Sequence, residues 1–169
     1  MRDTCLELLE LTYYEAPFAF DGLADENVWK RPAPGLLSVG ELAGHIAFWQ
    51  AVKFAGEGGE PLPDPAKCRV ISPLVDTKFA YYTTNLPASP SPQHLAMTAK
   101  QVCDELLRVH RESMAHFKSL NPDLATCPPG WPPYWTYAEL LKYAVFHVSY
   151  HVGQMYSARH LLGESTPDN

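Results

Sequence analysis

The segment that best defines the fold reads Ser38-Val-Gly-Glu-Leu-Ala-Gly-His-Ile-Ala-Phe-Trp-Gln-Ala-Val-Lys-Phe-Ala55. Its first four residues form a capping-box pattern, in which the Ser38 oxygen accepts from a free backbone amide and Glu41 reaches back to the N-cap. His45 shares a helical face with Leu42 and Trp49, which lie about one turn away on either side. We therefore predict a helix from Ser38 to about Ala55 with His45 on its buried stripe.

Three other segments show the apolar spacing of helices, and they cover approximately residues 3–16, 92–120 and 136–163. Pro17 follows the first of them and would end or kink it. Pro92 suits the first position of the second helix. Thr136 begins another capping-box pattern, and Gly163 suits a left-handed residue after the last helix.

Two long connections separate these helices, a proline-rich stretch at 60–92 and an aromatic one at 127–135. Four helices with two long connections predict an all-α four-helix bundle whose chain does not simply run up-down-up-down. With 169 residues, the chain is expected to form a single domain over residues 1–169.

Composition excludes several classes of function. The net charge is -6 and there is no run of Lys or Arg, so we expect neither a nucleic-acid partner nor binding to an anionic membrane. The beginning of the chain is charged, and no segment approaches a transmembrane run, which favours a cytoplasmic protein. The four cysteines form no CxxC pair, which argues against a thiolate zinc site.

The candidate chemistry lies in the sequence His147-Val-Ser-Tyr-His151. Two imidazoles four residues apart share one helical face, and this face is otherwise mainly apolar or aromatic. Buried imidazoles need polar partners, which a shared ion provides. The spacing alone is a weak motif, and Val148 replaces the glutamate of the HExxH proteases. Together with His45 the pair predicts a three-histidine site for one divalent metal ion, with coordination positions left open.

Simpler interpretations remain for each histidine. His45, His147 and His151 could be ordinary core residues, and Gln154 is either a partner of a ligand or an unremarkable helix amide. The four remaining histidines are expected at the surface or the edge of the core; they are His94, His110, His116 and His160.

The segment from Ser38 to Trp49 resembles the second-helix motif of the DinB/YfiT-like metalloenzyme family (DinB superfamily). Residues 146–154 and 159–163 resemble the fourth-helix motif of the same family, so the resemblance extends over nearly the whole chain. It implies an up-down-down-up four-helix bundle, a homodimer, and His45, His147 and His151 as ligands of one divalent ion. Zinc or nickel is the usual metal, and iron or manganese would also accept imidazole ligands.

The resemblance also implies a class of reaction. Relatives include S-transferases that use bacillithiol or mycothiol and a mycothiol-dependent isomerase, whose glutamate ligand has no counterpart among the three histidines here. We therefore expect a metal-dependent enzyme that uses a low-molecular-weight thiol and a small-molecule substrate, with no catalytic residue assigned. A hydrolase using metal-bound water and a non-enzymatic, metal-binding stress protein are the alternatives. The aromatic side chains expected to wall the cavity are Tyr81, Tyr82, Trp131, Tyr134 and Trp135.

Overall fold

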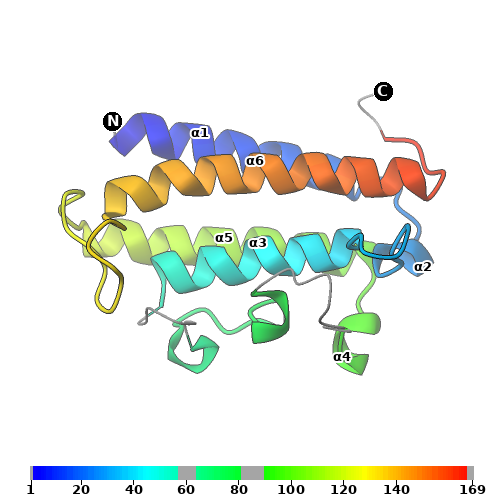
Figure 1. Cartoon of the computed structure of the whole chain (residues 1–169), viewed down its shortest axis with the longest axis horizontal. Coiled ribbons are helices and arrows are strands. Elements are labelled where there is room, and N and C mark those ends of the chain that lie inside the picture. The colour runs from blue at the N-terminus through cyan, green and yellow to red at the C-terminus, as the bar shows by residue number, and fades with distance from the viewer. Residues whose placement is uncertain (1, 57–63, 81–89, 167–169) are drawn as a thin grey trace.

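The computed structural model describes residues 2–56, 64–80 and 90–166, and within these ranges every regular element is helical. Four long helices lie side by side (Figure 1): α1 (Arg2–Glu15), α3 (Val39–Phe54), α5 (Ala99–Leu120) and α6 (Tyr137–Leu161). The short elements are η1 (Ala16–Ala19), α2 (Asp25–Val28), η2 (Pro65–Lys67), η3 (Thr77–Phe79) and α4 (Pro92–Leu95). The all-α prediction is confirmed, whereas the up-down-down-up order stays a prediction.

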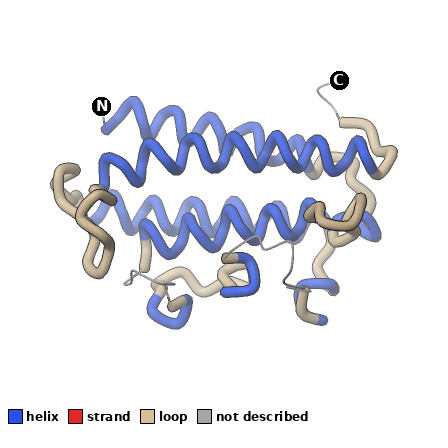
Figure 2. Tube along the Cα trace, viewed as in Figure 1, coloured by secondary structure: helices blue, strands red, loops and turns tan. Residues whose placement is uncertain are grey.

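Helix α3 is the central element of the packing. It contacts both α5 and α6, and α1 covers another side of α6. Every residue of α3 except Trp49 is buried, which is the pattern of a helix enclosed by other elements. Figure 2 shows loop segments running below the helices, and η3 from this region packs on α3. A polar side chain on α3 must therefore find its partners inside the protein.

The predicted capping box at the start of α3 is present. The Ser38 oxygen accepts from the backbone amide of Glu41, and the Glu41 carboxylate accepts from the backbone amide of Ser38 at 2.9 Å. The same carboxylate is almost fully buried and accepts hydrogen bonds from Arg31, with Nε 3.0 Å from each oxygen. A buried carboxylate is stable only when it is paired in this way, so Arg31 fixes where α3 begins.

Two glycines allow other segments to approach the backbone of α3 closely. A Cβ at Gly40 would lie 2.6 Å from the Trp29 ring, and a Cβ at Gly44 would lie 2.6 Å from the Phe79 ring. Trp29 is held in place by its indole N–H, which donates to the backbone carbonyl of Met97 at 3.0 Å. The absence of side chains at these positions thus brings two aromatic rings directly onto α3.

The single helix expected over 92–120 is wrong, because the structure divides it into α4 and α5. Thr98 is the N-cap of α5, and its oxygen accepts from the amide of Gln101. The Asp25 carboxylate accepts from the amide of Ala99 at 2.9 Å, so a residue from α2 also stabilises this new helix start. Leu95, the last residue of α4, is exposed.

The other predicted helix ends are close to the observed ones. Asn121 adopts a left-handed conformation after α5, and Gly163 does the same after α6. Thr136 caps α6 by accepting from the amide of Glu139, so among the described residues one half of the predicted capping box is present.

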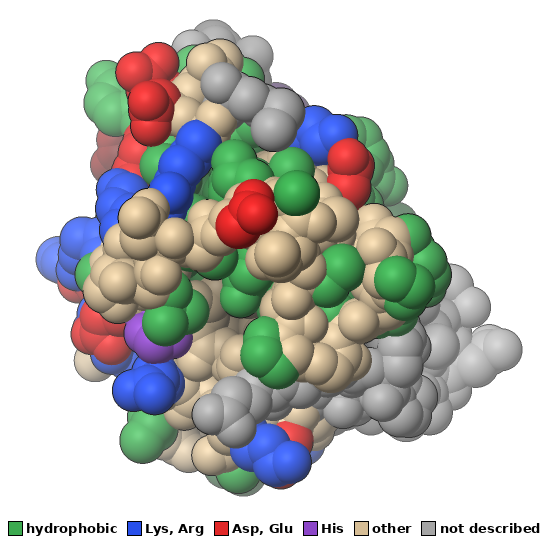
Figure 3. Space-filling model, turned by 90° about the vertical axis from the view of Figure 1, so that its left-hand side faces the viewer, with side chains coloured by type: hydrophobic (Ala, Val, Ile, Leu, Met, Phe, Trp, Pro, Cys, Tyr) green, Lys and Arg blue, Asp and Glu red, His purple; other side chains and the backbone are tan. Residues whose placement is uncertain are grey.

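The surface seen from the end where α6 begins mixes acidic and basic side chains around hydrophobic ones (Figure 3), so this face carries no single basic patch. Within the ranges that the structure describes, no helix is both long and apolar enough to pass through a membrane.

The close approach at Gly44 can be tested by comparing an alanine substitution there with one at an open position, Gly153. Gly44→Ala should lower the free energy of unfolding by about 1–3 kcal/mol, because its new methyl group overlaps Phe79. Gly153→Ala in the exposed part of α6 meets no atom within 4 Å, so it should be neutral or should stabilise the helix by about 0.5–1 kcal/mol. Urea unfolding followed by circular dichroism measures both, and equal effects of the two substitutions would contradict the proposed close approach.

Candidate metal centre

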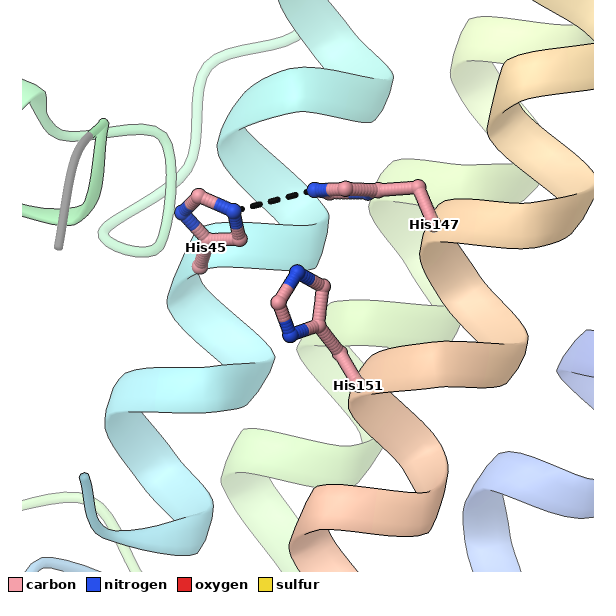
Figure 4. Close-up of side chains that lie close together, drawn as sticks. All are labelled: His45, His147 and His151. Atoms are coloured by element: carbon pink, nitrogen blue, oxygen red, sulfur yellow. Dashed lines mark hydrogen bonds between the residues drawn. The ribbon is translucent and has the colours of Figure 1, made fainter. Parts of the chain in front are cut away.

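Three histidines from two helices meet on one side of the bundle core. His45 extends from the middle of α3, and His147 and His151 extend toward it from successive turns of α6 (Figure 4). One ring nitrogen from each lies within 4.8 Å of the others, and the Nε2 atoms of His45 and His147 are 2.9 Å apart. The structure therefore brings together all three residues that the sequence singled out.

Hydrogen bonds orient two of the three rings. The Nδ1–H of His45 donates to the backbone carbonyl of Phe79 at 2.7 Å, and the Nδ1–H of His151 donates to the side-chain oxygen of Gln154 at 2.7 Å. A neutral imidazole that donates from Nδ1 keeps its lone pair on Nε2. Outer partners of this kind are the usual way in which proteins fix metal-binding imidazoles. The sequence left Gln154 open between this role and that of an ordinary helix amide, and the structure shows the contact with His151. The Phe79 carbonyl has no signal in the sequence.

Burial keeps the three rings neutral. Burial first, and the neighbouring His151 second, lower the pKa of His45 to about 3. Burial is also the largest cause of the lowered pKa of His147 and of His151, and the positive charge of Lys53 adds to both effects. At neutral pH the three imidazoles therefore offer lone pairs rather than positive charges.

This donor set fits a divalent ion. Two imidazole nitrogens bound to one zinc ion at about 2.0–2.1 Å lie roughly 2.8–3.4 Å apart for angles near 90–110°. The separation of 2.9 Å between the His45 and His147 nitrogens lies within that range. Three neutral nitrogen ligands also leave coordination positions for a small molecule, which distinguishes catalytic from closed structural sites.

The three histidines lie on the wall of a cavity of about 470 Å³, a size typical of small-molecule sites. Its other lining residues are mainly aromatic: Trp49, Lys53, Ala80, Trp131, Trp135, Tyr143, Phe146 and Tyr150. Trp131 and Trp135 occupy the predicted wall, but Tyr134 is exposed and is not among the lining residues. The predictions for Tyr81 and Tyr82 fall outside the described residues.

Among the described lining residues that the sequence did not predict, Lys53 is the one that carries a charge. Its ammonium lies over the ring of Tyr143 at 4.3 Å, over Trp49 at 5.1 Å and over Trp135 at 6.0 Å. Burial lowers its pKa to about 7. Lys53 follows His45 by about two helical turns on α3, so its spacing could have identified it as a neighbour of the site.

The other histidines divide into two groups. His116 is half-buried and His160 is exposed, which agrees with the surface or core-edge expectation. His94 and His110 are fully buried, so the expectation is wrong for them. Each of these two rings has hydrogen-bond partners at both nitrogens, which offsets the cost of burying it.

The lowered pKa values predict acid sensitivity of the metal-free protein. An unfolded histidine titrates near 6.5, whereas folded His45 stays neutral down to about 3. The unfolded state therefore takes up protons first, and stability falls as the pH drops below about 6.5. His45 alone should remove about 2 kcal/mol of unfolding free energy between pH 7.5 and 5.

Urea unfolding in the presence of a chelator at these two pH values measures this loss. His45→Gln should make the pH dependence shallower, while the same substitution at exposed His160 should leave it unchanged. An equal slope in wild type and His45→Gln would refute the assignment of the acid sensitivity to this site.

Comparison with known proteins agrees with the geometry. The family model described as the DinB superfamily matches residues 8–155, which include the three histidines and all four long helices in whole or in part. No curated protein and no solved structure matches the chain. Since the family model covers most of the sequence, the chain belongs to the DinB superfamily.

Proposed function

We propose that this protein is a metal-dependent enzyme in which His45, His147 and His151 hold one divalent ion. The observation that carries the proposal is that three neutral, buried imidazoles converge on the wall of a cavity large enough for a small molecule. Zinc or nickel is the favoured metal, and iron or manganese is compatible with the same ligands. Membership of the DinB superfamily supports this assignment.

The reaction that we propose is transfer of a low-molecular-weight thiol to an electrophilic small molecule. A divalent ion at the three histidines would lower the pKa of a bound thiol and so provide a thiolate at neutral pH. The Phe79 carbonyl and Gln154 would hold the imidazoles in the orientation that this requires. The rings of Trp131 and Trp135 would bind the apolar part of the electrophile and keep water away from it.

Metal-assisted hydrolysis has less support. No aspartate or glutamate occurs among the described residues that line the cavity, so no carboxylate is placed to act as the general base for a water molecule.

We also propose that the protein works in the cytoplasm and as a homodimer. Cys5, Cys68, Cys103 and Cys127 are all free thiols, which suits the reducing compartment that a thiol co-substrate needs. The homodimer is proposed from the family resemblance alone.

Metal analysis of protein purified without a histidine tag tests the ligand set. The wild type should contain about one divalent ion per chain, and His147→Ala should lose at least about tenfold in metal affinity because a direct ligand is removed. His160→Ala changes an exposed histidine and should retain the metal. Equal metal content in wild type and His147→Ala, including no metal in both, would refute the proposed site.

The thiol-transfer reaction is tested separately on the metal-loaded protein. Conjugation of low-molecular-weight thiols to a panel of electrophiles should be accelerated, and chelation or His147→Ala should remove the acceleration. The consumption of free thiol measures the rate. If the loaded protein hydrolyses model esters but conjugates no thiol, the hydrolase alternative replaces our assignment.

A further inference from the structure

Lys53 is a buried cation at the candidate site that has no acidic partner. Its side chain is 6% exposed, yet no aspartate or glutamate among the described residues forms an ion pair with it. Its recorded contacts are the faces of Trp49, Trp135 and Tyr143, which we call the aromatic cage. Aromatic faces attract a cation through their quadrupoles but accept no strong hydrogen bond, so they compensate its lost hydration only in part.

The uncompensated positive charge of Lys53 lies on the wall of the cavity. Lys53 and all three cage residues line the same cavity as the histidines. The Lys53 ammonium lies 4.3 Å from the centre of the Tyr143 ring, and this ring stacks on His147 with 5.6 Å between the ring centres. A ligand that reaches the histidines therefore enters the field of this lysine.

A second donor in the same wall also lacks an acceptor. The indole N–H of Trp131 is buried and has no hydrogen-bond partner among the described residues. Buried donors are almost always satisfied in folded proteins. The Trp131 indole and the Lys53 ammonium, which has no acidic partner, therefore indicate an acceptor that the described residues do not provide. The described wall of the cavity thus carries a positive charge that no carboxylate in it neutralises.

We propose that Lys53 binds a carboxylate of the molecule that occupies this cavity, so that the thiol partner is a carboxylate-bearing one. Its sulfur would lie at the three histidines and its carboxylate at the ammonium held in the aromatic cage. This inference rests on the proposed metal-dependent function, and it adds the chemical class of the ligand. A charged hydrogen bond to a buried ammonium is strong enough to select an acid over its neutral ester.

The test compares 3-mercaptopropionate with its methyl ester, which keeps the same thiol and carbon chain but replaces the negative charge by a neutral methyl ester. Calorimetric titration of the zinc-loaded protein at neutral pH should give an affinity for the acid at least about tenfold higher than for the ester. Lys53→Met should bind the two ligands equally and should keep the wild-type affinity for the ester. Methionine fills the aromatic cage without charge, so the thermal stability of this variant should not fall.

Lys142→Met is the matched control. Lys142 lies on α6, where it is half exposed and pairs with Glu139 instead of lining the cavity. This variant should retain the full preference for the acid. Metal content is measured before and after each titration, so that removal of zinc by the thiol is detected.

The outcomes separate the two proposals. If the wild type holds no metal, the proposed function fails and this inference fails with it. If the wild type holds metal but binds acid and ester equally, or if Lys53→Met keeps the preference, the metal site stands and the role of Lys53 is refuted.

Discussion

Phe79 lies against the backbone of α3 at Gly44, where the absence of a side chain leaves room for its ring. This contact brings the Phe79 carbonyl within 2.7 Å of His45 Nδ1, one residue further along α3. The carbonyl in turn directs the lone pair of His45 toward His147 and His151. The close approach of Phe79 to Gly44 therefore holds the segment that contains η3 against α3. It also sets the orientation of His45, the candidate metal ligand.

The enclosure of α3 makes its polar side chains informative. Glu41 is paired with Arg31, His45 with a backbone carbonyl, and Gln50 with His110 and Met114. These three are satisfied within the protein, as buried polar groups must be. Lys53 differs, because aromatic rings surround it and no carboxylate among the described residues neutralises it. On α3, the polar residues Glu41, His45 and Gln50 have hydrogen-bonding partners within the protein. Among the described residues, Lys53, which we assign to ligand binding, contacts aromatic rings instead.

Burial in the cavity wall acts on both the histidines and Lys53, and the consequences for ligand binding differ. Burial favours neutral imidazoles, which suits the binding of a cation, and it also disfavours the charged form of the nearby lysine. An anionic ligand would be attracted by both a bound metal ion and Lys53. The aromatic walls strengthen these interactions, because they keep the effective dielectric constant low. The burial that disfavours the charged form of Lys53 would therefore be offset by a charged ligand.

The sequence by itself determined the helices, most of their ends and the three histidines, because capping patterns and helical spacing are local properties. His45, His147 and His151 could be proposed as buried residues because their neighbours one helical turn away are apolar or aromatic. The family resemblance then assigned all three to one metal site. The break before Ala99, the burial of His94 and His110, the Phe79 carbonyl and the cage around Lys53 were decided by tertiary structure. Each depends on a partner far away in the chain, such as Asp25 for Ala99 or Tyr143 for Lys53, and local spacing carries no information about such contacts.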